Sequence, residues 1–144
     1  MISITERLRT TFSRLVLEWG TSQRYEVSIP VSFRIIDTGR ARRMSRFLSG
    51  ITQDISETGL ALLTDTISAD GLHAYFSSDM MDKNLLQVLL HVPEGDISLL
   101  GQTCRYLSID RSDYNYLLGV KMINMSAADR ARFNKLLLDS KKKL

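Results

Sequence analysis

The spacing of apolar residues divides the chain into a helical segment, a series of strands and a second helix. Near the N-terminus, apolar residues recur at the intervals of an amphipathic helix: Ile4, Leu8, Phe12, Leu15, Val16 and Trp19. Ser3 and Glu6 match a helix-capping box, and Gly20 ends the pattern. We therefore expect an amphipathic helix within residues 1–22, whose apolar stripe packs across the rest of this chain, on a partner or on a second copy.

From Tyr25 the spacing changes to the two-residue period of a half-buried strand. Apolar residues from Val27 to Ile35 alternate with polar ones, and Pro30 among them indicates a sheet edge or a bend. Further strand patterns, separated by turn residues, cover 47–55, 60–64, 85–92, 97–109 and 114–123. About six strands joined by tight turns predict a small antiparallel barrel or sandwich.

Two segments depart from the strand pattern. Residues 65–84 begin with a polar, glycine-containing stretch, and we expect a long connection there with one helical turn near 73–81. Ser126 suits the cap of a last helix, whose apolar face comprises Phe133, Leu136 and Leu137. The predicted parts are an N-terminal helix at 1–22, a β domain at 23–125, and a C-terminal helix with a basic tail at 126–144.

Length and composition limit the class of protein. With 144 residues, 44% hydrophobic and 24% charged, the chain suits one globular domain with terminal additions. No apolar run approaches the roughly 18 residues of a membrane span. Glu6, Arg7 and Arg9 also interrupt the apolar run that a signal peptide needs, so we expect a cytoplasmic protein. Cys104, the single cysteine, can form neither an intrachain disulfide nor a thiolate metal site.

The net charge of +3 is unevenly distributed. Basic residues gather at the terminal lysines 141–143, which suit a solvated tail, and in the stretch GRARRMSR, which includes Arg42 and Arg46. Clustered guanidiniums repel one another unless they are well solvated or meet an anion. The arginine stretch is therefore either an exposed hairpin tip or a site for a phosphate-bearing partner.

Candidate catalytic groups are scarce. His73 and His91 are the two histidines, and a lone strand histidine such as His91 is more often a packed or surface residue than a base. Ser56 lacks the context of a nucleophile elbow, and the chain has no glycine-rich phosphate loop with a lysine. We expect a binding module and not an enzyme, without catalytic residues, metal site or cofactor.

The stretch QDISETG, from Gln53 to Gly59, combines a carboxylate, a hydroxyl and a glycine between two apolar runs. As a structural corner, it would place Gly59 at positive φ while Asp54 and Ser56 accept hydrogen bonds from turn amides. As a binding site, it would present Asp54 as an acceptor and Ser56 as a hydroxyl partner. Both roles are compatible, because the turn aims the side chains.

Several landmarks together resemble the PilZ domain. They are RYEVSIPV from Arg24, the D-x-S-x-x-G signature of Asp54, Ser56 and Gly59, LLQVLLHVPEG from Leu85, LGQTCR from Leu100, and GVKM from Gly119 with Ser126 and Arg130. The landmarks follow the order and approximate spacing of that family over about residues 23–140. The resemblance implies a mainly β fold, a six-stranded antiparallel barrel with a C-terminal helix. Many PilZ domains are receptors for the bacterial second messenger cyclic di-GMP.

Binding members of the family also use an R-x-x-x-R motif before the first strand, whose arginines contact guanine and phosphate. Alignment of RYEVSIPV with that strand makes Arg24 the second arginine, with Gly20 in place of the first. If Arg24 is the first arginine, Ser28 stands in the second place. One arginine is missing in either alignment, and Arg42 or Arg46 is a candidate replacement.

The resemblance implies a regulatory domain that binds cyclic di-GMP and relays the signal to an unidentified protein partner, as in motility regulation. The ligand-binding residues would be Arg24, Asp54, Ser56 and Gly59, with Arg42 and Arg46 as further candidates. The alternative is a PilZ-like interaction module of pilus or motility machinery that binds no nucleotide. We expect no DNA partner, because the tyrosines are too few and too close to acidic residues for a nucleic-acid-binding barrel. The sequence is compatible with a homodimer.

Overall fold

The computed structural model describes residues 23–39, 42–78, 82–109 and 113–142. The helix expected within residues 1–22 lies outside these ranges. In chain order the elements are β1 (Tyr25–Glu26), β2 (Pro30–Ile36), β3 (Leu48–Ser56), β4 (Gly59–Thr64), β5 (Ser68–Ala69), β6 (Leu72–His73), β7 (Leu85–Leu90), β8 (Ile97–Ser108), β9 (Tyr116–Asn124) and α2 (Ala127–Lys142). No helix among the described residues is long and apolar enough to cross a membrane.

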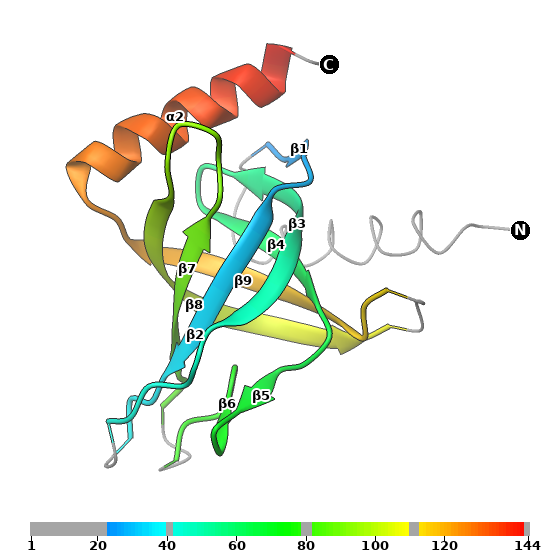
Figure 1. The fold of residues 1–144 in the computed structure, drawn as a ribbon, viewed down its shortest axis with the longest axis vertical. Helices are drawn as coiled ribbons and strands as arrows, with labels where there is room; N and C mark the ends of the chain where they lie inside the picture. The colour runs from blue at the N-terminus through cyan, green and yellow to red at the C-terminus, as the bar shows by residue number, and fades with distance from the viewer. Residues whose placement is uncertain (1–22, 40–41, 79–81, 110–112, 143–144) are drawn as a thin grey trace, which may run out of the picture.

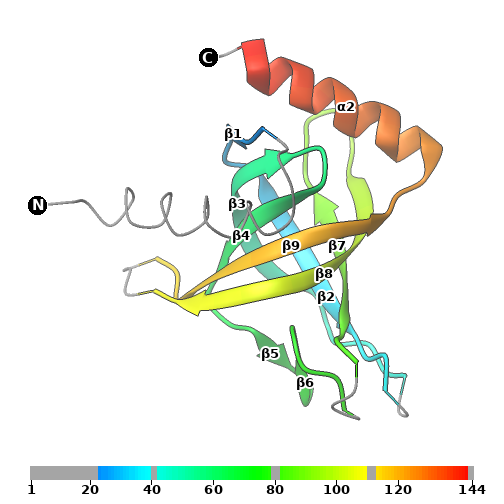
Figure 2. The same ribbon diagram turned by 180° about the vertical axis from the view of Figure 1, so that it is seen from behind.

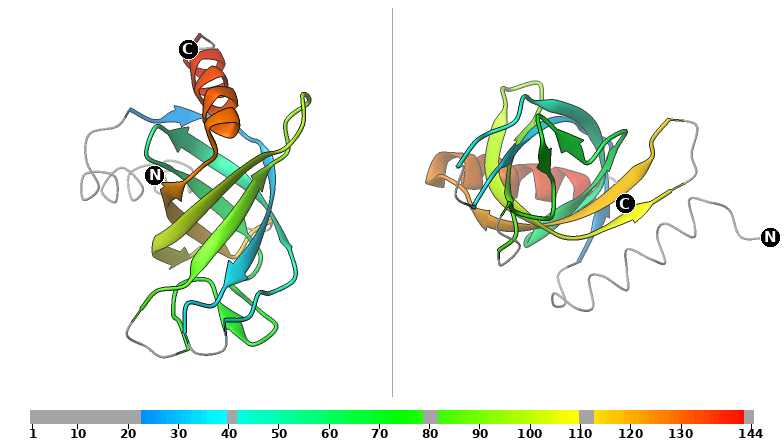
Figure 3. Two further views of the ribbon diagram at one scale, coloured as in Figure 1. Left: turned by 90° about the vertical axis from the view of Figure 1, so that its left-hand side faces the viewer. Right: turned by 90° about the horizontal axis from the view of Figure 1, so that it is seen from below.

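Six strands close into an antiparallel barrel. They follow the order β3, β2, β7, β8, β9 and β4, and β4 pairs again with β3. Seen from below, the strands enclose a ring (Figure 3). The expectation of a six-stranded barrel is confirmed, and the sandwich alternative is excluded.

The interior of the barrel is filled by one apolar cluster. Its largest fully buried side chains include Phe33, Ile35, Ile55, Leu60 and Leu62. α2 lies across the end of the barrel that also contains β1, which we call the upper end (Figures 1 and 2). Phe133 and Leu137 of α2 belong to the same cluster.

The predicted C-terminal helix is confirmed, with its cap. Ser126 Oγ accepts a hydrogen bond from the Asp129 amide at 3.1 Å, and its hydroxyl donates to Asp129 Oδ2 at 3.2 Å. This reciprocal arrangement satisfies an amide of the first turn that has no partner within the helix.

A break at residues 27–29 separates β1 from β2, where the alternation had predicted one strand. Both strands pair with β3, and the hydroxyl of Thr52 in β3 bridges the break. Thr52 Oγ1 accepts the Ile29 amide at 2.9 Å and donates to the Val27 carbonyl. Pro30 follows directly, so the bend that its position indicated is confirmed. Because of the break, β1 pairs with the end of β3, at Asp54 and Ile55, whereas β2 pairs with the beginning of β3.

The lower end of the barrel contains the β5–β6 hairpin and the described parts of two connections, from β2 to β3 and from β6 to β7 (Figure 1). The helical turn predicted near 73–81 is absent from the described residues 73–78, which correct that expectation. The ring of His73 accepts the amides of Tyr75 and Phe76 at 3.0 and 3.2 Å. Asn84 donates to the carbonyls of His73 and Phe76 at 2.8 and 2.9 Å. The side chains of His73 and Asn84 thus form hydrogen bonds with backbone amides and carbonyls that would pair with one another in a helical turn.

Candidate functional site

Arg24 and Asp54 form an ion pair where β1 meets the end of β3. The pairing of Glu26 with Asp54 brings β1 alongside the signature. Arg24 Nε donates to Asp54 Oδ1 at 2.6 Å, and Nη2 lies 2.5 Å from the same oxygen. Only 13% and 6% of the two side chains are exposed. The structure thus joins two residues that the sequence had selected separately.

The burial of this pair changes its acid–base properties. Burial raises the pKa of Asp54 to about 6, and the neighbouring guanidinium of Arg24 opposes the rise. Burial also lowers the pKa of Arg24, which Asp54 opposes. The arginine remains protonated near neutral pH because its ordinary pKa is so high. Asp54 is therefore an anion at neutral pH that becomes protonated under mildly acidic conditions.

Ser56 closes the turn between β3 and β4. Its Oγ accepts a hydrogen bond from the Thr58 amide at 3.3 Å, and its hydroxyl donates to the Gly59 carbonyl at 3.3 Å. The residue is fully buried. The predicted hydrogen bond to the turn is confirmed for Ser56, and the residue can influence a ligand by fixing the turn beside Asp54.

Gly59 contradicts the predicted backbone conformation. Among the described residues, the glycines at positive φ are Gly71 and Gly95, and Gly59 is the first residue of β4. A Cβ atom at Gly59 would lie 2.2 Å from the carbonyl oxygen of Val120 in β9. The expectation of positive φ was wrong. Glycine is required there because the backbone of β9 passes so close.

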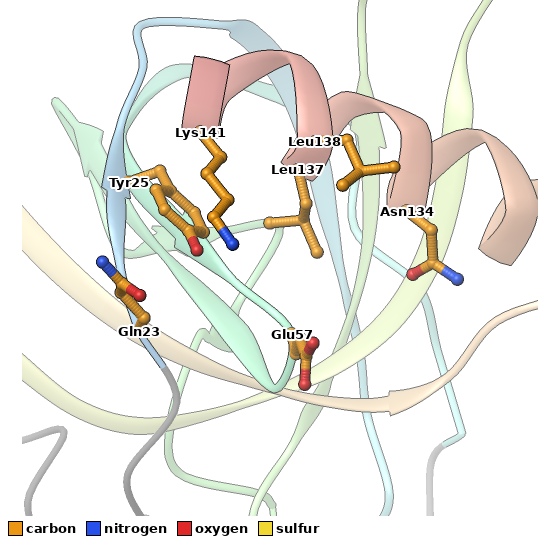
Figure 4. Close-up of a pocket in the computed structure, with 7 residues that line it drawn as sticks. All are labelled: Gln23, Tyr25, Glu57, Asn134, Leu137, Leu138 and Lys141. Atoms are coloured by element: carbon orange, nitrogen blue, oxygen red, sulfur yellow. The ribbon is translucent and has the colours of Figure 1, made fainter. Parts of the chain in front are cut away.

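A cavity of about 650 Å³ lies next to the ion pair, between β1, the β3–β4 turn and α2. Figure 4 shows Tyr25 and Lys141 pointing toward one another across it, with Glu57 on the turn below. Arg24 and Asp54 are not among its lining residues, although the cavity has polar and charged residues of its own, including Glu57 and Lys141. We place the candidate site on the ion pair, because it joins Arg24 to Asp54 of the D-x-S-x-x-G signature.

The structure does not bring Arg42 and Arg46 to this site. Both lie on the β2–β3 connection at the lower end, away from β1 (Figure 1). Arg42 is exposed with a positive φ of 47°. Arg46 contacts Asp70 of the β5–β6 turn, with Nη1 2.9 Å from Oδ1 and its amide donating to Oδ2 at 2.6 Å. Arg42 or Arg46 could replace the missing motif arginine only if the β2–β3 connection moved to the opposite end of the barrel.

The sequence analysis missed one hydrogen-bonded arrangement of catalytic residue types. Ser32 Oγ lies 2.7 Å from His91 Nε2, and His91 Nδ1 lies 2.8 Å from Asp96 Oδ1. The order of groups is that of a serine hydrolase triad. Ser32, however, lies in the middle of β2 between β3 and β7, whose ladders use the surrounding amides that an oxyanion hole would need. His91 and Asp96 are also 38% and 52% exposed, so the arrangement links β2, β7 and the following turn on the barrel surface.

Solved structures with the same fold are PilZ domains. The PilZ domain of YcgR from Escherichia coli, solved with c-di-GMP, is 11% identical, with a TM-score of 0.53, over 86% of this chain and 92% of that chain. The PilZ domain of CeSA from a cellulose-synthesizing bacterium is 13% identical, with a TM-score of 0.52, over 83% and 99%. PlzA of Borreliella burgdorferi, in complex with c-di-GMP, is 14% identical, with a TM-score of 0.52, over 91% of this chain and 57% of that chain.

Sequence comparison leads to the same family. No curated protein matches the chain. The family model of the PilZ domain matches residues 21–139, which include β1, the whole barrel and most of α2. This chain therefore belongs to the PilZ domain family.

Proposed function

We propose that the chain is a receptor domain for cyclic di-GMP that binds the ligand at the Arg24–Asp54 pair and relays the signal through protein contacts. The observation that supports this proposal best is the pair itself. Two oppositely charged side chains lie together with little exposure, beside the turn of the D-x-S-x-x-G signature. YcgR and PlzA, which share the fold, are both known in structures with c-di-GMP.

The chemistry of the pair suits guanine and phosphate. A carboxylate accepts hydrogen bonds from the N–H groups on the Watson–Crick edge of guanine, which Asp54 can supply at neutral pH. A guanidinium matches guanine O6 and N7 or a phosphate with paired donors, which is the role of Arg24. Arg24 Nε and Nη2 both contact Oδ1 of Asp54. A carboxylate can accept hydrogen bonds at both oxygens, so Oδ2 is a candidate acceptor for the ligand.

The incomplete arginine motif sets the expected strength of binding. Ser28, one of the two positions where the missing arginine would stand, is an exposed residue in the break between β1 and β2. Gly20, the other position, lies outside the described residues. A missing charge-assisted contact costs about 1.5–3 kcal/mol, or roughly one to two decades of affinity. We therefore expect weaker binding than in a domain with both arginines.

Calorimetric titration of the full chain with cyclic di-GMP tests the proposal. The wild type should bind saturably at pH 7.5, and Arg24→Ala should lower the affinity about tenfold to a hundredfold. Arg42→Ala is a matched control at the lower end and should leave the affinity at high salt unchanged. A folded wild type without saturable binding, or binding lost with Arg42→Ala and kept with Arg24→Ala, would contradict the proposal.

A second candidate function is a PilZ module that works by protein contacts alone. The missing motif arginine favours it, as does the cavity beside α2, whose walls include Tyr25, Leu137 and Leu138. Leu138 is 57% exposed, which is unusual for a large apolar side chain. Absence of nucleotide binding by the folded wild type would support this candidate over the receptor.

A further inference from the structure

The barrel has a second apolar cluster on its outer surface. Leu60 and Leu62 of β4 belong to the interior cluster, whereas Ala61 and Leu63, which alternate with them, point the other way. The residues of this second cluster, which we call the outer apolar face, are Ile51, Ala61, Leu63, Leu107, Ile109, Tyr114 and Leu117. They lie on or beside β3, β4, β8 and β9, which adjoin one another in the sheet.

The strand register arranges these residues in rows across the sheet. One row is entirely apolar and comprises Ile51, Leu63, Leu117 and Leu107, each opposite the next. The neighbouring row comprises Glu26, Asp54, Ala61, Gly119 and Arg105. Its two small residues, Ala61 and Gly119, are directly opposite one another, beside the larger Leu63–Leu117 pair.

The outer apolar face is shielded from solvent. Ala61, Leu63 and Leu117 are 0%, 6% and 1% exposed, although they point away from the interior. Neighbours within one sheet cannot cover such residues from above. α2 does not cover them either, because its buried residues Phe133 and Leu137 pack in the interior cluster. Ile109 and Tyr114, in the connection between β8 and β9, belong to the same cluster and cover part of this face. The apolar row runs across four strands, so we infer a further cover over the rest of it.

The length and position of the N-terminal segment match this requirement. Residues 1–22 join the described chain at Gln23, immediately before β1, and Glu26 of β1 shares a row with Ala61. Ala61 lies two strands from Glu26, or ~10 Å, and Gly119 lies three strands away, or ~14 Å. The residues from Trp19 to Glu26 can span ~23 Å when extended, which is enough for Trp19 to reach Ala61 and Gly119.

We propose that residues 1–22 of the same chain cover the outer apolar face, with Trp19 packed over the small residues Ala61 and Gly119. The apolar stripe from Ile4 to Trp19 would extend ~24 Å as a helix, long enough to cross the four strands. Leu63 and Leu117 bury the other side chains of the stripe. The proposal does not depend on nucleotide binding.

Trp19 is the single tryptophan of the chain, so its fluorescence reports the contact directly. In the folded wild type, emission should lie at short wavelength and resist quenching by acrylamide. Leu107→Glu, at a half-buried position of the outer apolar face, should shift the emission to longer wavelength and raise the quenching constant at least threefold. Leu138→Glu, the same substitution at an exposed position of α2, is the matched control and should change neither quantity.

Limited trypsin digestion adds a second readout. Arg7, Arg9 and Arg14 lie within the segment, and cleavage there should be at least tenfold faster in Leu107→Glu than in the wild type or in Leu138→Glu. Far-UV circular dichroism verifies that each variant is folded. The proposal fails if Trp19 of the folded wild type is quenched as freely as tryptophan in water, or if Leu107→Glu leaves both readouts unchanged. It also fails if the protection of Trp19 disappears when a dimer is diluted to monomer, which would make a second copy the cover.

Discussion

Two buried aspartates, one at each end of the barrel, have pKa values shifted in opposite directions. Asp54 at the upper end is 4% exposed, and Asp37 at the lower end is 2% exposed. Burial raises the pKa of Asp54 to about 6 against the influence of Arg24. Burial also acts to raise the pKa of Asp37, but hydrogen bonds from Gly39 and Ser78 outweigh it and hold that pKa below its usual value.

The difference arises from the kind of partner. Asp37 Oδ1 accepts the amides of Gly39 and Ser78 at 3.1 and 3.3 Å, and Oδ2 accepts the Ser78 hydroxyl at 3.1 Å. These neutral donors belong to two connections, which Asp37 holds together. Asp54 instead pairs with Arg24, which is itself mostly buried, and the nearby Glu26 carboxylate adds to the rise of the Asp54 pKa. A buried charge pair stabilises a fold poorly, and perturbed carboxylates concentrate at functional sites, so the comparison supports a binding role for Asp54 and a structural one for Asp37.

Removal of Arg24 should give the largest effect. Arg24→Ala leaves the carboxylate of Asp54 buried without its cation, and we expect a loss of about 3 kcal/mol in the free energy of unfolding, measured by urea denaturation at pH 7.5. The double variant Arg24→Met/Asp54→Leu removes both charges and should lie within about 1 kcal/mol of the wild type. A single variant as stable as the wild type would show that the pair is solvated in solution.

Removal of Asp37 should give the next largest effect. Asp37→Ala leaves the amides of Gly39 and Ser78 without their acceptor and separates the two connections of the lower end. We expect the melting temperature to fall by about 5 °C, measured by differential scanning calorimetry. Cyclic di-GMP affinity at the upper end should not change. If a folded Asp37→Ala variant loses affinity for cyclic di-GMP, Asp37 is not purely structural, and the assignment of different roles to the two aspartates is wrong.

Titration of Asp54 should give a smaller effect with a definite sign. Its folded pKa of about 6 exceeds the unfolded value of about 3.9, so the folded state takes up a proton first as the pH falls. The resulting stabilisation is fully present below the unfolded pKa and is lost as the pH rises through about 6. Between pH 7.5 and 5, the wild type should gain about 1 kcal/mol relative to Asp54→Asn, which cannot titrate. A constant difference between the two proteins would mean that Asp54 has an ordinary pKa.

The exposed pair of Arg46 and Asp70 should give the smallest effect. Its side chains are 66% and 44% exposed, so solvent screens the attraction. Arg46→Ala should lower the melting temperature by less than about 2 °C, and the difference should shrink as salt is raised. If Arg46→Ala destabilises the protein as much as Arg24→Ala does, the exposure of an ion pair does not determine how much it contributes to stability.

The sequence predicted the parts of the fold that depend on local spacing. Apolar alternation located the first barrel strand, and strand patterns bounded by turn residues located the other five. The cap at Ser126 was predictable because the serine and its partner Asp129 lie within one turn. The break between β1 and β2 was not, because Thr52, which bridges it, is 23 residues from Ile29 along the chain.

The candidate site was predicted in its residues but not in its geometry. The resemblance selected Arg24 and Asp54 separately, and strand pairing over 30 residues places them in contact. The resemblance also suggested Arg42 and Arg46 as replacements for the missing arginine, and the barrel places them at its opposite end. Sequence spacing could not reveal this, because the distance between two loops depends on which ends of the strands they join.

The sequence by itself determined the strand and helix periods, the signature and the lack of a complete arginine motif, since these are properties of neighbouring residues. Only the tertiary structure decided why Gly59 must be glycine, because the carbonyl that excludes a Cβ atom belongs to Val120 on another strand. It alone also decided the opposite pKa shifts of Asp54 and Asp37. A carboxylate's protonation depends on the solvent and donors that surround it in space, and those come from segments distant in the chain.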